Sequence, residues 1–130
     1  MTTPTKSIPF ATLPAIGAEL EGGIFFGIIT NPDGAHCAAI LLPAKPDKRL
    51  TWKKALAWAV EQDAELPSRP VASMLFANLK AQLQPDWHWT SEEDDASYAW
   101  HCSFSGGGIL SLRKSYEGSC VAVRCIHLTA

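Results

Sequence analysis

The sequence lacks the features that define several large classes of protein. Its formal net charge is −2, so it has no large positive field of the kind that binds nucleic acid through phosphates. Its longest apolar stretches, such as IFFGII at residues 24–29, are much shorter than the roughly 20 residues that a membrane-spanning helix needs. Prolines and polar residues stand near the start, where a signal peptide would carry a continuous apolar run. We therefore expect a protein made in the cytoplasm that binds no nucleic acid and inserts into no membrane.

The cysteines form no metal-binding or redox motif. No C-x-x-C motif occurs among the four cysteines, and they do not combine with the histidines in a zinc-finger spacing. They are Cys37, Cys102, Cys120 and Cys125. Without an export signal, a disulfide framework loses its main support. We expect most of the cysteines to be small buried hydrophobes, while a metal site and pairing among them stay open as alternatives.

The length fits a single domain, since 130 residues with 47% hydrophobic content can bury one core. Residues 1–20 are rich in proline and threonine without a clear period, which predicts an extended N-terminal arm before a domain at 21–130. The stretch GGIFFGIITNPDGAHCAAILLP then holds two apolar runs around Asn31-Pro32-Asp33-Gly34. These turn residues predict a hairpin, and its apolar strands should be covered on both faces.

Two helices are predicted next. The first follows Thr51 as N-cap and should bury residues at helical spacing, namely Trp52, Ala55, Leu56, Ala59 and Val60. The second spans about residues 70–83, with Pro70 in its first turn and Ser68 or Arg69 as cap. Its expected buried residues are Val71, Met74, Leu75, Leu79 and Leu83.

The rest of the chain predicts short strands. They are WHWTS at residues 87–91, YAWHCSF at 98–104, GILSLRKS at 108–115 and CVAVRCIHL at 120–128. Two strands, two helices and several further strands indicate the α+β class, with both helices grouped on one side of an antiparallel sheet.

Alternation assigns the side chains of YAWHCSF to two faces. A period of two sends Tyr98, Trp100, Cys102 and Phe104 into the core and Ala99, His101 and Ser103 outward. A catalytic Cys/His pair is poorly supported, because neighbouring strand residues point to opposite faces.

Two loops carry other candidate chemistry. SEEDDAS concentrates carboxylates at residues 92–95 without the spacing of an EF-hand, so a solvated acidic loop is the preferred interpretation and calcium binding the alternative. The glycines at residues 106–108 join strand to strand with no helix N-terminus behind them, which favours a hairpin end over a phosphate loop.

Three segments carry a resemblance to a known family. They are LTWKKALAWAVEQDAELPSRPVASMLFANL, PDWHWTSEEDDASYAWHCSFSGGG and the terminal VAVRCI. Together they resemble the domain of unknown function 1566 family, small domains frequent in phages and prophages, over about residues 20–127. Where that family commonly ends in an arginine-rich run, this chain keeps only Arg124 before Cys125.

The resemblance implies a C-type-lectin-like fold, in which two helices flank a curled antiparallel sheet whose first and last strands meet. It also implies a non-enzymatic binding module without a cofactor or metal, a tail or tail-fibre accessory in the virion of a phage or prophage. The implied partners are a protein or cell-surface receptor and other tail proteins, and a homotrimer is one implied assembly because tail-tip proteins are often trimeric. The E-P-N and W-N-D motifs that hold calcium and sugar in true C-type lectins are absent.

The candidate contact residues follow from the alternation together with the resemblance. The expected core side of the late strands consists of Trp100, Phe104, Leu110, Leu112, Val121 and Val123. The expected outward side offers His101, Ser103, Ser105, Ile109, Ser111 and Arg113, with Tyr116 and Glu117 in the next loop. Arg113 and Tyr116 lead this set because arginine and aromatic side chains dominate protein interfaces. Ordinary solvent-facing strand positions remain the alternative for each residue.

Two other functions stay open. One is a prophage protein that binds a host protein inside the cell. The other is an enzyme, because the wider lectin-like fold includes the formylglycine-generating oxidases, which use paired cysteines. Cys120 and Cys125 stand five apart on an expected strand and so face opposite ways, which argues against such a pair.

Overall fold

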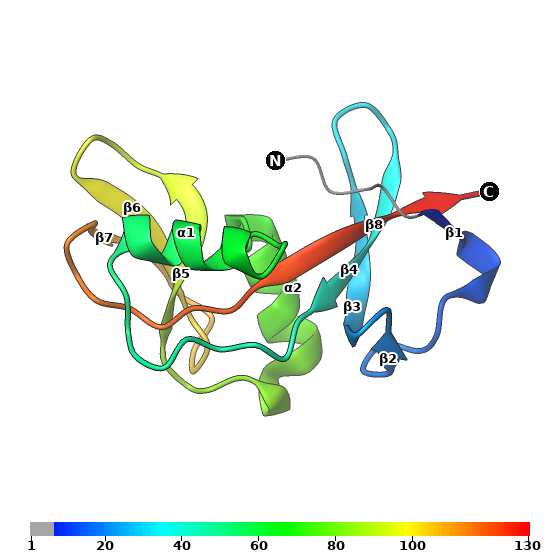
Figure 1. The fold of residues 1–130 in the computed structure, drawn as a ribbon, viewed down its shortest axis with the longest axis horizontal. Helices are drawn as coiled ribbons and strands as arrows, with labels where there is room; N and C mark the ends of the chain where they lie inside the picture. The colour runs from blue at the N-terminus through cyan, green and yellow to red at the C-terminus, as the bar shows by residue number, and fades with distance from the viewer. Residues whose placement is uncertain (1–6) are drawn as a thin grey trace.

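A computed structural model describes residues 7–130, so residues 1–6 of the predicted arm lie outside the described part. In chain order the strands and α-helices are β1 Ser7–Pro9, β2 Glu19–Leu20, β3 Gly23–Thr30, β4 His36–Leu41, α1 Trp52–Glu61, α2 Arg69–Leu79, β5 Trp87–Glu93, β6 Tyr98–Ser103, β7 Ile109–Arg113 and β8 Val123–Thr129. Short 3-10 turns occupy Phe10–Thr12 and Lys80–Gln82. The chain is α+β, with two helices between an early hairpin and the late strands (Figure 1).

Five strands form one curled sheet in the order β1-β8-β4-β3-β2. The predicted hairpin of β3 and β4 is confirmed, and its turn is closed by the Gly34 amide donating to the Asn31 carbonyl at 2.9 Å. β4 is covered on both faces, since Ala38 and Ala39 belong to different buried clusters. The expectation of a purely antiparallel sheet is wrong at one edge. There β1 runs parallel to β8, on the side that β4 leaves unpaired, which makes the sheet mixed.

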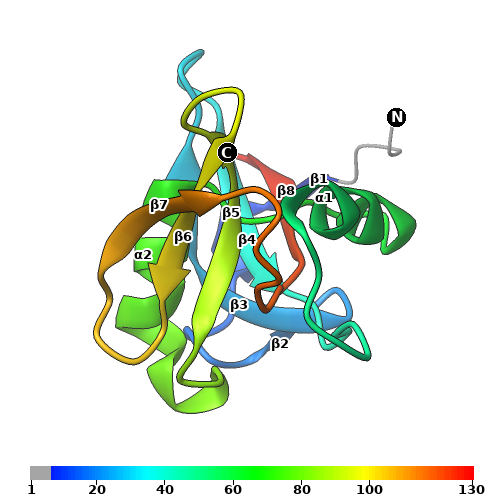
Figure 2. The ribbon, with the colours of Figure 1, turned by 90° about the vertical axis from the view of Figure 1, so that its left-hand side faces the viewer.

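A second sheet has the order β5-β6-β7 and lies between the two helices. On one face Trp89 and Ala99 cluster with Ala55 of α1, and on the other Cys102 clusters with Leu75 of α2. Figure 2 shows α1 and α2 on opposite sides of these strands. The expectation that both helices group on one side of a sheet is therefore wrong for this sheet.

The helices begin where the sequence predicts. The Ser68 hydroxyl accepts a hydrogen bond from the Val71 amide at 3.4 Å and caps α2, whereas the Thr51 side chain makes no such bond to α1. α2 ends at Leu79 rather than near residue 83, because a 3-10 turn follows it. Val60 was expected in the core but is 54% exposed. None of the helices within residues 7–130 has the length and apolar character needed to cross a bilayer.

The expected core of the helices is otherwise largely present. Trp52, Ala55 and Ala59 of α1 are buried, and so are Leu75, Leu79 and Leu83 in and after α2. Val71 and Met74 are half-buried and pack against the same cluster as Leu75. The prediction for the cysteines is confirmed, since Cys37, Cys102 and Cys120 are buried and Cys125 alone among the four is exposed.

Candidate binding surface along β7

The register of β6 and β7 separates the predicted contact residues. Tyr98 lies opposite Arg113 and Trp100 opposite Ser111, while His101 lies opposite Leu110. Because residues directly opposite each other share a face, Ser111 and Arg113 project on the side of Trp100, and His101 projects on the other side with Leu110. The structure therefore does not bring the predicted set together on one face.

His101, expected to point outward, is fully buried at 0% exposure. Its ring stacks on Trp89 with centroids 3.6 Å apart, and the ring of Tyr116 meets its edge at 5.5 Å. Gly118 closes the site, since a Cβ there would lie 2.9 Å from His101 Nε2. Among the described residues neither ring nitrogen has a hydrogen-bond partner. Burial, followed by the charge of His88, lowers the pKa of His101 to about 4.

Ser103, Ala99 and Trp100 of β6 also depart from the alternation. Ser103, also expected to face outward, is 6% exposed, and Ala99 on the same face is 0% exposed. Trp100, expected in the core, is half-buried under the guanidinium of Arg69, which lies 4.6 Å from its ring centroid. The physical reason is that α1 and α2 cover opposite faces of this sheet, so neither face of β6 is left to water along its whole length.

What remains exposed gathers on β7 and the loop after it. Seven large apolar side chains are exposed among residues 7–130, and three of them belong here: Leu110 at 47%, Tyr116 at 41% and Ile109 at 38%. Leu110 was expected in the core, but it lies at the outer edge of the sheet, where β7 has no further neighbour. Ser105, Arg113 and Glu117 are exposed as expected, and Ser111 is half-buried. We call Ile109, Leu110, Arg113 and Tyr116 the β7 surface.

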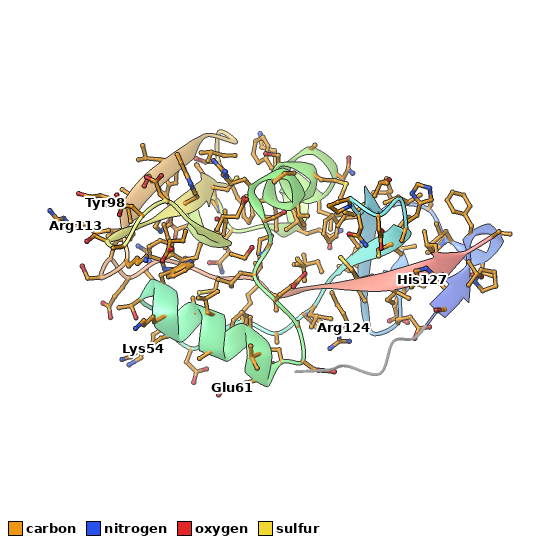
Figure 3. The ribbon with its side chains drawn as sticks, turned by 90° about the horizontal axis from the view of Figure 1, so that it is seen from above. Lys54, Glu61, Tyr98, Arg113, Arg124 and His127 are labelled. Carbon is orange, nitrogen blue, oxygen red and sulfur yellow. The ribbon has the colours of Figure 1, made fainter. Side chains whose placement is uncertain are left out.

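Polar contacts hold the β7 surface in place at one end. The Arg113 guanidinium lies 5.5 Å from the ring centroid of Tyr98, and the two side chains stand together at one end of the molecule (Figure 3). Ser111 donates a hydrogen bond to Asp94 at 2.8 Å, and Lys114 pairs with Glu93. These contacts tie the strand to the acidic loop, so the exposed residues project from an ordered base.

The acidic loop has partners within the protein for each of its carboxylates. Glu92 accepts from both the Arg69 amide and its side chain; burial raises the Glu92 pKa, but these hydrogen bonds and the charge of Arg69 lower it overall. Asp95 accepts from the amides of Ser97 and Tyr98. Within residues 7–130 no group of three or more His, Cys, Asp or Glu side chains is arranged to hold a metal ion.

Three of the cysteines have thiols with raised pKa values. Burial raises the pKa of Cys120 to about 12. The pKa of Cys125 is also raised to about 12, by desolvation of its thiol and by the charges of Glu65 and Cys37, although the residue keeps exposed surface. Burial also raises the pKa of Cys102. Since the thiolate is the nucleophile, thiols with raised pKa values react slowly near neutral pH.

Comparisons of the sequence with protein-family models and with curated proteins find no match. The alternation missed that Leu110 is exposed and that His101 is buried, and both follow from the structure. One sequence signal points to the buried β6 strand: residues 98–104 contain no charged side chain, as is usual for a strand covered on both faces.

Proposed function

We propose that this chain is a non-enzymatic binding module with C-type-lectin-like architecture. Support for the architecture comes from the order of elements. β4, which precedes the two helices, pairs with the last strand β8, and the three strands of the second sheet come after the helices and before β8. The pairing of β4 with β8 and the meeting of β1 with β8 resemble the closure expected of that fold.

The observation that carries the binding function is the exposed β7 surface. Tyr116 contacts the buried His101 ring, Leu110 lies opposite His101 in the strand register, and Arg113 lies on the other face of the same edge strand. A partner that wraps this edge strand would therefore meet exposed apolar side chains, an aromatic ring and an arginine, which are residue types common at protein interfaces. The unpaired edge of β7 also offers backbone groups to a partner strand.

We propose a phage or prophage origin on the sequence resemblance, with the module acting as a tail or tail-fibre accessory that recognises a receptor or another virion protein. The raised pKa values of Cys102, Cys120 and Cys125 favour this proposal over the oxidase alternative, which needs reactive cysteines.

The test is to follow the tagged protein in the strain that encodes it and to compare the double variant Arg113→Ala/Tyr116→Ala with Lys53→Ala/Val60→Ala, a matched pair of exposed residues on α1. The proposal expects the protein in purified particles and a loss of at least tenfold in retention for the β7 double variant only, since each anchor residue contributes about 1 kcal/mol or more. Equal retention of both folded variants would refute the β7 surface. A protein found free in the cell and bound to a host protein would favour the host-binding alternative over the virion role.

A further inference from the structure

A pocket lies where the two sheets meet, and it shares no lining residue with the β7 surface. It has a volume of about 650 Å³, within the range of roughly 300–1,000 Å³ that small-molecule sites occupy. Its walls come from the start of β3, the end of β4, the loop at 42–50, the segment at 82–88 and residues 119–121. Because segments distant in sequence converge on it, its shape depends on the tertiary fold.

One end of the pocket carries an ordered polar network. Asp86 Oδ2 accepts hydrogen bonds from Arg49 at 2.6 Å and from the Ser119 hydroxyl at 2.8 Å. Burial raises the Asp86 pKa, but the bonds from Ser119 and the Trp87 amide and the charge of Arg49 lower it overall. Asp86 is thereby held as a carboxylate that orients Arg49, whose remaining N–H groups stay available.

His88 is the buried polar group of this wall. It is 3% exposed, its ring stacks on Phe104 at 4.4 Å, and its Nδ1 lies 3.0 Å from the Asp86 carbonyl oxygen. A carbonyl only accepts, so Nδ1 carries the proton and Nε2 is left as an acceptor. Among the described residues Nε2 of His88 has no hydrogen-bond partner. It also keeps some accessible surface, since the only unpaired polar side-chain atoms that are fully buried in residues 7–130 are the two nitrogens of His101. A ligand in the pocket would therefore meet an acceptor here and would need to donate.

The charges around His88 define that donor further. Burial lowers the His88 pKa, and the charges of Lys45 and Arg49 lower it further against the opposing effect of Asp86, so both cations lie close enough to be felt by the ring. A cationic donor is disfavoured beside them, whereas a hydroxyl is not. Lys45 and Lys48 line the pocket and form no ion pair with any residue at 7–130, so they are available to an anion.

The charged residues that line the pocket limit the negative charge that a bound ligand can carry. Three cationic residues, Lys45, Lys48 and Arg49, are balanced in number by Glu19, Asp47 and Asp86, so the pocket is better matched to a monoanion than to a dianion such as a phosphate ester. The apolar walls are aliphatic, and no Phe, Tyr or Trp is among the described lining residues. They include Ile24, Leu41, Leu42, Leu83 and Val121.

We propose that this pocket binds a small hydroxylated carboxylate with an aliphatic body, its hydroxyl donating to His88 Nε2 and its carboxylate facing Lys45 and Arg49. The site is separate from the β7 surface and does not depend on the binding function proposed there.

The test uses three probes with one carbon skeleton: 2-hydroxy-4-methylpentanoate, 4-methylpentanoate and leucine. Binding is followed by proton–nitrogen NMR titration, with the amides of Ser119 and Val121 reporting on the pocket. The hydroxy acid should bind about three- to tenfold more tightly than the unsubstituted acid, which is the usual worth of one hydrogen bond, and leucine should bind less tightly than the hydroxy acid. Equal affinities, a preference for leucine, or shifts that fail to saturate at the pocket would each overturn the proposal.

Variants locate the effect. Lys45→Met should weaken the binding of the hydroxy acid and of the unsubstituted acid about two- to fivefold. Lys53→Met changes an exposed lysine on α1 outside the pocket and should leave both affinities unchanged. His88→Phe should abolish the advantage of the hydroxy acid over the unsubstituted acid. If His88→Phe does not fold, the affinities of the three probes for the wild type and for Lys45→Met still test the proposal. The Arg113→Ala/Tyr116→Ala variant should keep full probe binding, so failure of the pocket and failure of the β7 surface are distinguishable.

Discussion

Replacing His101 with leucine should remove a pH-dependent loss of stability. In the folded protein the pKa of His101 is lowered from 6.5 to about 4, whereas the unfolded chain titrates near the ordinary value. The unfolded state therefore binds the proton first as the pH falls, so stability is complete above about pH 6.5 and is lost progressively towards about pH 4. A difference of this size corresponds to roughly 3 kcal/mol in the free energy of unfolding once both states are protonated.

The assay is urea unfolding of the wild type and His101→Leu at about pH 7.5 and about pH 4.5, where the linkage predicts a relative gain of about 2–3 kcal/mol for the variant on acidification. Near neutral pH the change should be small. Removing two unpaired buried nitrogens stabilises by about 1–3 kcal/mol, while losing the ring contacts with Trp89 and Tyr116 costs about 0.5–1.5 kcal/mol. His36→Gln, at an exposed histidine, serves as control and should retain the acid sensitivity of the wild type. Parallel losses of stability in His101→Leu and the wild type would refute the burial of a neutral imidazole.

Three further predictions concern the same sheet and the thiols. Gly118→Ala should destabilise the protein by about 1–3 kcal/mol, because the added Cβ would approach His101 Nε2, and the loss should be smaller in the His101→Leu background. A double-mutant cycle by urea unfolding measures the coupling between the two positions, and additive effects would contradict the predicted contact. Thr90→Val should cost about 1–2 kcal/mol, since the buried Thr90 hydroxyl donates to the Trp100 carbonyl at 2.9 Å. The exposed Thr129→Val is the control, and equal unfolding midpoints of the two variants would count against the bond. In a thiol titration near pH 8, the buried Cys102 and Cys120 should react slowly in the native protein and rapidly in denaturant, whereas a fast native thiol at either position would revive the oxidase alternative.

Local patterns predicted the elements of the fold well. The β3–β4 hairpin follows from turn residues between two apolar runs, and α2 follows from Ser68 and Pro70 before a helical period. These features depend on neighbours in the chain, so the sequence contains what determines them. The parallel pairing of β1 with β8 joins segments about 120 residues apart, as Ser7 lies opposite His127, and no local pattern specifies it.

The candidate site could be predicted only in part. Arg113, Tyr116 and Ile109 were expected on the surface and are exposed. The alternation failed at His101 because it assumed that only one face of the sheet is buried, whereas helices cover both faces of β6. It failed at Leu110 because β7 is the outer strand of its sheet, so Leu110 is exposed although it lies opposite the buried His101, and the place of a strand in its sheet is not visible in the sequence.

The most direct test of the β7 surface compares Leu110→Asp with Val60→Asp, two exposed aliphatic residues, one on β7 and the other on α1. Both proteins are titrated onto purified particles from the encoding strain, and their dissociation constants are measured beside the wild type. A charge buried in the contact should weaken binding of Leu110→Asp by about tenfold or more, while Val60→Asp should bind as the wild type does. Wild-type affinity for Leu110→Asp, or equal weakening of both variants, would contradict the assignment of recognition to this edge of the sheet.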